Sequence, residues 1–415
     1  MIRLVTLSAA VLAALSFGCQ TGRHSASPGL APAQGSSPSI VHVVGNEAGD
    51  ASESGAGGTR GSDAGSGGAA GDNAGGASDA PLFGANEIVS AAVASCEKAA
   101  ISRPLSVLPA SPLNAIYDRL GTVGDHRFAY SRDAQTLLTF DSAGNLSTAL
   151  NDVAAVASNG TELSVVFQDA TRTILQRYDE TLNAQGPNVK LADGEARSLA
   201  AASTATTTLV SSIAGDQLLA RVVAGDAIVE LSIPLGDSAG HCRSQAVSAG
   251  TNFALIYACT GTPNEVRWAL ISDAGKLLKT AVVLEPAVAL DLTAFKAIGT
   301  GYVLMLHSLE QKSAYLVRID AKGQVDGAIR AVSGLLQAFD LAASSSGVSL
   351  TGMLEDGTTA LGRIGDDAAP NAEGAWTCLD QTSPGGNAAL ETVKQVDSVL
   401  VHYGNGSEWL MTLPH

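Results

Sequence analysis

A short apolar segment that ends in a turn of the form Asp with Gly shortly after recurs along the chain beyond residue 110. It constrains the fold more than any other feature. The clearest copies are LLTFDSAGNL, WALISDAGKL and LVRIDAKGQV, whose glycines are Gly144, Gly275 and Gly323. An apolar run ending in such a turn predicts a β-hairpin. The last two glycines are 48 residues apart, and the first two are 131 apart, close to three such units. The spacing therefore predicts a repeat of about 40 to 50 residues.

Further copies of the pattern fill the interval between the clear ones. The strands that run into the turns end at Phe140, Tyr178, Val223, Ile271, Ile319, Ile364 and Leu413. Each follows a second apolar strand across a polar turn, and most units begin with a shorter strand of small residues such as VAAVAS or SLAAAS. An outer strand follows the turn, as in IVELSIPL and LLKTAVVL. Small residues suit an innermost strand, which is crowded near a central axis. Together with the two apolar strands and the outer strand, it gives four predicted strands in each unit.

Four strands per unit at this period resemble the blade of a β-propeller, and residues 81–415 resemble one all-β domain of seven four-stranded blades. The chain ends after the third strand of the seventh unit, so we expect a strand from residues 81–109, with LSVLP as the candidate, to complete it. Six or eight blades stay open because the second, third and sixth units are weak. The blades lack the Trp-Asp pairs of WD40 repeats and the double glycines of Kelch repeats, so no subfamily is assigned.

Residues 20–80 differ sharply from the repeats, because Gly, Ser, Ala, Pro and Asp dominate them. Such a segment has few large apolar side chains to offset the chain entropy of folding, so we expect a disordered tether. A Gly-rich coil of about 60 residues has a root-mean-square reach of about 40 Å. One apolar patch, SIVHVV at residues 39–44, interrupts it. The patch is interpreted as a transiently associating segment, with a docking motif as the alternative.

Residues 1–19 have the pattern of an export signal, with a basic residue at Arg3, an apolar stretch and a small residue before Cys19. They resemble a bacterial lipoprotein signal peptide, in which the cysteine becomes the acylated N-terminus. The cleavage box departs from the usual one, because Leu15 lies one position early and Phe17 replaces a small residue. An ordinary signal peptide cleaved near Gly18 is the alternative. The resemblance implies lipidation at Cys19, a membrane anchor and a place in the cell envelope, at the outer membrane or cell surface.

The other four cysteines can pair completely in an exported protein, in three connectivities. Cys242 and Cys259 flank the first strand pair of the predicted fourth blade, which is consistent with a disulfide inside that blade. Cys96 lies in the N-terminal region and Cys378 in the outer strand of the sixth blade, so a Cys96–Cys378 bond would latch the ring. Metal binding is the weaker alternative, because no Cys or His falls at zinc-finger spacing.

The sequence contains no Walker loop, nucleophile elbow, zinc-protease motif or calcium loop. We therefore assign no catalytic, metal or cofactor-binding residue and no cofactor. The scattered histidines are interpreted as surface or strand-edge residues: His24, His42, His126, His241, His307 and His402. Asp141, Asp179, Asp273 and Asp320 are interpreted as turn residues that bind local backbone amides. Trp268, Trp376 and Trp409 are interpreted as packing residues.

The formal net charge of −16 argues against nucleic acid as a partner, because a surface that binds phosphates must be positive. The sequence favours a noncatalytic binding or scaffold module, monomeric, for an unknown protein, peptide or glycan. The alternative is an exported hydrolase or lyase whose catalytic residues come from different blades and meet at the central channel. Charged residues, His or Tyr at the channel mouth would favour the enzyme, and an Ala, Ser and Thr lining would favour the scaffold.

Overall fold

The computed structural model describes most residues between 82 and 414 and one short strand before them. The described ranges are 40–44, 82–92, 96–98, 106–108, 119–141, 146–235, 242–260, 263–344, 347–365, 376–379, 387–393, 396–402 and 408–414. Backbone contacts divide the chain into residues 1–36 and 37–415, and every described residue belongs to the second unit. The predicted signal segment with Cys19 and most of the predicted tether thus lie outside the described residues.

Within each blade, four consecutive strands form an antiparallel sheet in which the order across the sheet follows the order along the chain. Blade 1 comprises β5 (Arg119–Val123), β6 (His126–Ser131), β7 (Thr136–Phe140) and β8 (Leu146–Leu150). Blade 2 comprises β9 (Val153–Ser158), β10 (Leu163–Gln168), β11 (Arg172–Tyr178) and β12 (Ala184–Asp193). Blade 3 comprises β13 (Arg197–Ser203), β14 (Thr208–Ala214), β15 (Gln217–Ala224) and β16 (Ala227–Pro234).

The next three blades repeat this order. Blade 4 comprises β17 (Cys242–Ala249), β18 (Asn252–Cys259), β19 (Glu265–Ser272) and β20 (Leu277–Leu284). Blade 5 comprises β21 (Asp291–Ile298), β22 (Gly301–Ser308), β23 (Ser313–Ile319) and β24 (Ile329–Ser333). Blade 6 comprises β25 (Leu335–Ser344), β26 (Gly347–Leu354), β27 (Thr359–Gly365) and β28 (Trp376–Cys378).

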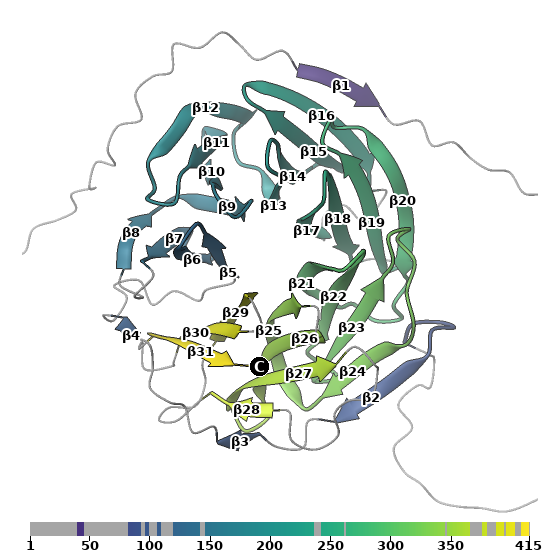
Figure 1. The fold of residues 1–415 in the computed structure, drawn as a ribbon. Helices are drawn as coiled ribbons and strands as arrows, with labels where there is room; N and C mark the ends of the chain where they lie inside the picture. The colour runs from purple at the N-terminus through teal and green to yellow at the C-terminus, as the bar shows by residue number, and fades with distance from the viewer. Residues whose placement is uncertain are drawn as a thin grey trace, which may run out of the picture. The chain divides into compact units, whose positions relative to one another are not determined.

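The first strand of each blade contacts the first strand of the next, in the succession β5, β9, β13, β17, β21 and β25. Figure 1 shows these strands around a common centre, with the outer strands at the periphery. Sheets of four antiparallel strands arranged radially in this way form a β-propeller. The prediction of an all-β propeller with four-stranded blades is therefore confirmed.

The blade number differs from the predicted seven, because six blades are described with their side chains. A further sheet contains β29 (Asn387–Val393), β30 (Val396–His402), β31 (Glu408–Pro414) and β4 (Ser106–Leu108). Apart from Ala388, its side chains lie outside the described residues. The predicted number rests on recurring hairpins in the sequence. A blade, by contrast, is established by the packing of its faces against the neighbouring blades.

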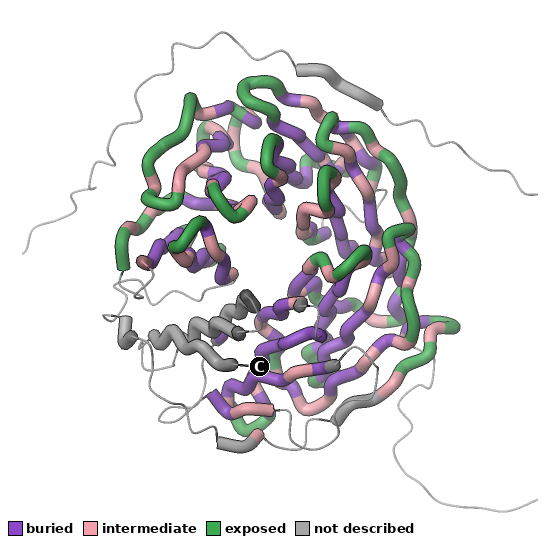
Figure 2. Tube along the Cα trace, viewed as in Figure 1, coloured by how far each residue is buried: buried purple, intermediate pink, exposed green. Residues whose placement is uncertain are grey.

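Burial follows position within a blade, as Figure 2 shows. The second strands β18 and β22 are buried at every position except the first. Strands covered on both faces read as continuous apolar runs, which explains NFALIYAC and GYVLMLHS. The outer strand β20 is mainly exposed along its first half, where Leu278 is 46% exposed. The core of the domain thus lies between successive blades, over their inner and middle strands.

Two of the predicted turn aspartates, Asp179 and Asp320, bind local amides in the way that the sequence indicated. Asp179 Oδ1 accepts hydrogen bonds from the backbone of Thr181 and Asn183, at 3.0 and 2.9 Å. Asp320 Oδ1 accepts from the backbone of Lys322 and Gln324, at 2.8 and 2.9 Å. Backbone hydrogen bonds lower the pKa of both carboxyl groups. In the β19–β20 turn, by contrast, it is the Ser272 hydroxyl that accepts, from the Lys276 amide.

The glycine of the repeated turn is required by contact with the preceding blade. Gly275 and Gly323 have φ angles of +77° and +81°. A Cβ atom on Gly275 would overlap Val229 of blade 3, and one on Gly323 would overlap the indole of Trp268 in blade 4. Trp268 is fully buried, which confirms its predicted packing role. The repeated glycine therefore permits both the turn conformation and the close approach of two blades.

Replacing Gly323 by alanine should destabilise the domain more than the same change at Gly327. Both glycines have a φ of +81°, but a Cβ on Gly327 meets nothing within 4 Å. We expect Gly327→Ala to cost about 1 kcal/mol, from the backbone alone. Gly323→Ala should cost roughly 2–4 kcal/mol because it adds the overlap with Trp268. Urea unfolding measures both losses, and equal losses would contradict the proposed blade contact.

Segments that precede blade 1 add strands to the outer edges of later blades. β1 (Ile40–Val44) pairs in parallel with β16, β2 (Ile88–Ala92) with β24 and β3 (Glu97–Lys98) with β28. β4 pairs antiparallel with β31 and belongs to the segment LSVLP that the sequence offered as the closing strand. Added strands cover edges that would otherwise present unpaired backbone groups.

Both predicted disulfides are present, which confirms the two pairings. Cys242 and Cys259 face each other across β17 and β18, with their Cα atoms 4.0 Å apart. Cys96 and Cys378 join β3 to β28, with a sequence separation of 282 residues. In chain-entropy models a longer loop gives a larger restriction of the unfolded chain, so the second bond is the more effective constraint in that account. In the described part of the chain, no helix is long and apolar enough to cross a membrane.

Candidate functional site

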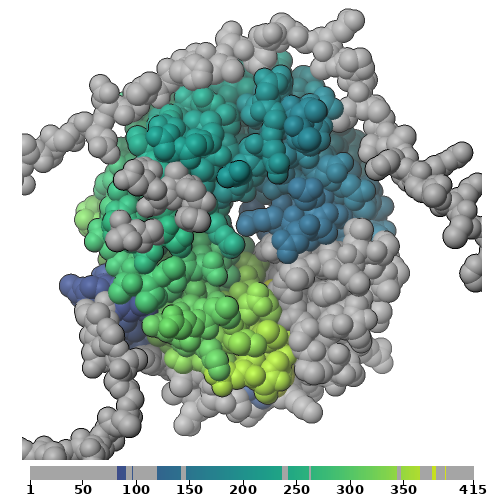
Figure 3. Space-filling model, turned by 180° about the vertical axis from the view of Figure 1, so that it is seen from behind, coloured from purple at the N-terminus to yellow at the C-terminus, as the bar shows by residue number. Residues whose placement is uncertain are grey.

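One end of the central channel opens into a cavity of about 300 Å³. We call this end the mouth. It lies where the inner strands begin and where the turns between second and third strands project. The charged, His and Tyr side chains that line it are Arg119, Tyr130, Arg132, Asp133, Arg243, Asp291, Lys296, His307 and Asp340. Figure 3 shows the ring from behind, with an opening at its centre.

Several of these side chains are engaged in bonds between neighbouring blades. Arg119 Nη1 donates to the Val156 carbonyl across the junction of blades 1 and 2, at 2.8 Å. The Tyr130 hydroxyl donates to the Ala154 carbonyl across the same junction, at 2.6 Å. Side chains that already bind a neighbouring backbone have a structural role, which accounts for their place in the channel wall.

Lys296 and Asp340 form an ion pair across the junction of blades 5 and 6. Lys296 Nζ lies 3.4 Å from Asp340 Oδ1, and the two side chains are 25% and 5% exposed. Asp340 Oδ1 also accepts a hydrogen bond from the Leu341 amide at 2.8 Å. Taking a carboxylate out of water costs several kcal/mol unless a cation and hydrogen bonds compensate, so Asp340 depends on Lys296.

His307 lies next to the end of β22, near a strand end as predicted, but it is buried at the mouth, which corrects the predicted surface position. It is 5% exposed, and its Nε2 lies 3.4 Å from the Leu335 carbonyl of blade 6. Burial lowers the pKa of His307 below its ordinary value, although the Leu335 bond and the charge of Asp291 act in the opposite direction. Burial thus favours the neutral form of the imidazole. The surface position was wrong because β22 is covered on both faces.

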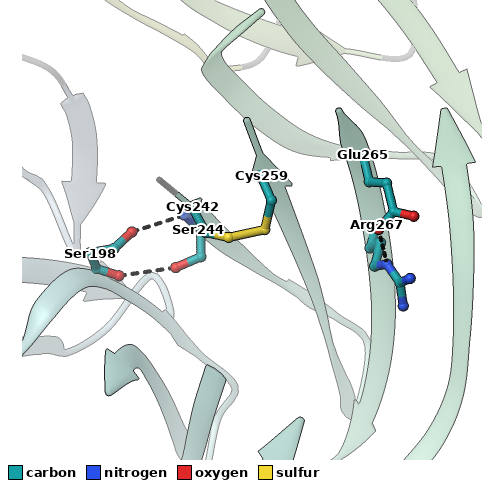
Figure 4. Close-up of a disulfide and its surroundings, with 6 residues drawn as sticks. All are labelled: Ser198, Cys242, Ser244, Cys259, Glu265 and Arg267. Carbon is teal, nitrogen blue, oxygen red and sulfur yellow. Dashed lines mark hydrogen bonds and ion pairs between the residues drawn. A yellow bond between two sulfur atoms is a disulfide. The ribbon is translucent and has the colours of Figure 1, made fainter. Parts of the chain in front are cut away.

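The junction of blades 3 and 4 joins serines beside the Cys242–Cys259 disulfide, as Figure 4 shows. Ser198 Oγ accepts from the Ser244 amide and the Ser198 carbonyl accepts from the Ser244 hydroxyl, both at 3.0 Å. Ser198 has a φ of 51°, and Asp152 at the start of blade 2 has a φ of 60°. Because the same conformation recurs at the start of two inner strands, it belongs to the blade geometry.

One pair of charges at the mouth is more open. Arg243 at the start of β17 lies 3.8 Å from Asp291 at the start of β21, and their side chains are 63% and 65% exposed. Exposed ion pairs at this distance contribute about 0–1 kcal/mol. These two groups are thus available to a ligand at little cost in stability.

The opposite end of the channel has a different lining. Its cavity of about 320 Å³ is bordered mainly by small residues, among them Gly121, Thr122, Ala157, Ser158, Ala202, Ser203, Ser248, Ala297, Ala342 and Ala343. Arg119 and Lys296 reach both cavities, so they lie between the two ends. The charged lining expected of an enzyme and the small-residue lining expected of a scaffold therefore occur in the same channel, at opposite ends.

The sequence singled out few of these residues. Among its candidates, His307 lines the mouth and Cys242 adjoins Arg243 at its rim, whereas the Cys96–Cys378 disulfide lies at the outer edge of blade 6. Cys19, His24 and His241 lie outside the described residues. The side chains of His42, His402 and Trp409 are not described, and Trp376 packs at Gly362. Sequence reasoning missed Arg119, Arg243, Asp291, Lys296 and Asp340. Their common signal is a charged residue within or at the start of a small-residue strand.

The chemistry available to the mouth follows from these groups. Within the described residues, no group of three or more His, Cys, Asp or Glu side chains could hold a metal ion. Ser244 is bonded to Ser198 and lies 3.3 Å from the Ser211 hydroxyl, so its described partners include no general base.

The comparisons with known proteins add only weak likenesses. No model of a protein family and no curated protein matches the chain. It is similar to the β-propeller domain of the Trilobed protease from Pyrococcus furiosus, with 13% identity, a TM-score of 0.47 and coverage of 72% of this chain and 95% of that one. It is also similar to the RRP9 WD40 repeats, with 11% identity, a TM-score of 0.49 and coverage of 77% and 99%. These likenesses carry no functional argument.

Replacing Lys296 by methionine should leave Asp340 buried without its cation. We expect a loss of about 2–3 kcal/mol, somewhat less than for a fully buried pair because Lys296 is partly exposed. Lys312→Met is the matched control, because Lys312 pairs with Glu355 where both side chains are about half exposed. That change should cost about 0–1 kcal/mol. Urea unfolding compares the two variants, and similar losses would show that Asp340 does not depend on Lys296.

Proposed function

We propose that the chain is a noncatalytic binding module that recognises a protein, peptide or glycan through the mouth of its channel. The observation that carries the proposal is that the charged side chains at the mouth fall into two groups, those engaged between blades and those open to solvent. Arg119, Lys296 and Asp340 bind across blade junctions, while Arg243 and Asp291 stay open to solvent. A mouth of fixed shape with a few accessible charges has the character of a recognition site.

We also propose that the complete ring has seven blades. The support for this is the position of β29, which contacts both β25 of blade 6 and β5 of blade 1. The sheet of β29, β30, β31 and β4 then completes the circle, with a strand from before blade 1 as its outer member. Closure of this kind ties the two ends of the domain together.

Export to the cell envelope is part of the same proposal. The signal-like segment and Cys19 support a lipid anchor at the outer membrane or cell surface, and the two disulfides are compatible with an exported protein. A tethered monomer would then present its mouth to partners outside the cytoplasm. The acidic net charge of −16 disfavours nucleic acid as the partner.

An exported hydrolase or lyase is the second candidate. The observation that favours it is the presence of Arg132, Asp133, Arg243 and Asp291 at the same mouth, contributed by three different blades. Catalytic groups that meet from separate blades would leave no linear motif in the sequence.

Peptide and glycan arrays probed with the mature protein test the proposed function. We expect binding to a defined subset, reduced at least tenfold by Arg132→Glu at the mouth. Lys276→Glu is the control, because this exposed residue lies in the β19–β20 turn, at the opposite end of its blade. It should leave binding unchanged.

A parallel screen with chromogenic esters and glycosides tests whether the protein is instead an enzyme. Turnover that Arg243→Gln abolishes would replace the binding proposal with the enzyme. Array binding that survives Arg132→Glu, or that Lys276→Glu removes instead, would place recognition away from the mouth.

A further inference from the structure

The outer edges of the blades are covered unequally in the described part of the chain. β16, β24 and β28 each pair with an added parallel strand, which is β1, β2 and β3 respectively. β20 of blade 4 has no such partner among the described residues, although Figure 1 shows it at the periphery between β16 and β24. An outer strand without a partner presents backbone groups with which another chain can pair.

β20 is the most regular of the outer strands that lack an added partner in the described residues. The other two are β8 of blade 1 and β12 of blade 2. β12 contains Pro187, and its pairing with β11 shifts register twice. β8 pairs regularly with β7 only from Thr148 to Leu150. β20 contains neither Pro nor Gly and pairs regularly with β19 from Lys279 to Val282. Proline, shortness and irregularity protect edges from pairing, so β20 is the best template of the three.

β20 also exposes large apolar side chains along this edge. Leu278 is 46% exposed and Val282 is 45% exposed. Apolar side chains that are this open to water gain free energy when another apolar segment covers them. The edge therefore offers an incoming strand both backbone partners and apolar contacts.

The neighbouring segments of this chain are engaged elsewhere or unsuited to cover β20. Ile40–Val44 and Ile88–Ala92 already pair with β16 and β24. Residues 45–81, which connect them to one another, contain no Val, Ile, Leu, Met, Phe, Trp or Tyr. Leu82 and Phe83, which come next, pack into the core shared by blades 4 and 5. A strand of apolar residues for β20 must therefore come from another molecule.

We propose that the outer edge of β20 binds an extended segment of another protein as a fifth, parallel strand of blade 4. The segment is about as long as the five-residue strands IVHVV and IVSAA, which cover β16 and β24, and like them it is rich in β-branched and small apolar residues. Main-chain hydrogen bonds hold it along β20, and its side chains cover Leu278 and Val282. This surface is separate from the mouth, so the inference does not rest on the proposed function.

Fluorescence anisotropy of a labelled peptide with the sequence of residues 37–46, SPSIVHVVGN, tests the inference on the mature protein. The peptide contains a strand that pairs in parallel with a blade edge of this protein. We expect saturable binding that Leu278→Lys and Val282→Lys each weaken at least tenfold. Leu146→Lys is the matched control, because Leu146 lies in the outer strand β8 and is 42% exposed. It should leave binding unchanged.

Two further measurements separate strand pairing from other kinds of binding. A peptide with N-methyl groups at residues 40–44 keeps the side chains but loses the backbone donors, so it should bind at least tenfold more weakly. Hydrogen exchange in β20 should slow when the unmodified peptide is bound. No binding, equal binding of the methylated peptide, or indifference to both β20 variants would overturn the inference. Self-association of the mature protein that Val282→Lys abolishes would also overturn it, because the occupant would then be a second copy.

Discussion

The ring is held together by hydrogen bonds to the backbone groups along the channel edge of each inner strand. Such a strand pairs with its own blade on one side and faces the channel on the other, where its backbone groups have no neighbouring strand. Side chains from adjacent blades meet these groups. Ser158 Oγ donates to the Thr122 carbonyl at 2.6 Å, and Gln245 Nε2 donates to the Thr293 carbonyl at 2.8 Å. Buried carbonyls left unsatisfied are costly, so these bonds hold the blades in register.

The same constraint explains the composition of the inner strands and the division of the mouth. Small side chains are frequent in the inner strands, and several of the long ones bind neighbouring blades. Arg119 and Lys296 serve blade junctions, and their charges are thereby withdrawn from chemistry. Arg243 and Asp291 at the rim are more open to solvent. The proposed binding function draws on this difference between engaged and open charges.

Much of the fold could be predicted from the sequence, because hairpin turns and apolar runs are local signals. The strands ending at Phe140 and Ile319 lie where the pattern placed them, and the disulfide partners followed from their positions in the blades. The mouth could not be predicted in the same way. Lys296 and Asp340 are 44 positions apart along the chain, and only the packing of blade 5 against blade 6 brings them together. His307 shows the same limit, because its burial depends on blade 6.

Native-state hydrogen exchange of the inner strands tests the central claim most directly. If bonds from neighbouring blades secure these strands, amides in β9, β17 and β21 should exchange as slowly as those in β10, β18 and β22, and only through global unfolding. The contradicting result would be inner strands that exchange orders of magnitude faster, at the rate of the exposed outer strand β20. The channel side chains would then line a loosely held edge, and their bonds would not be what holds the ring.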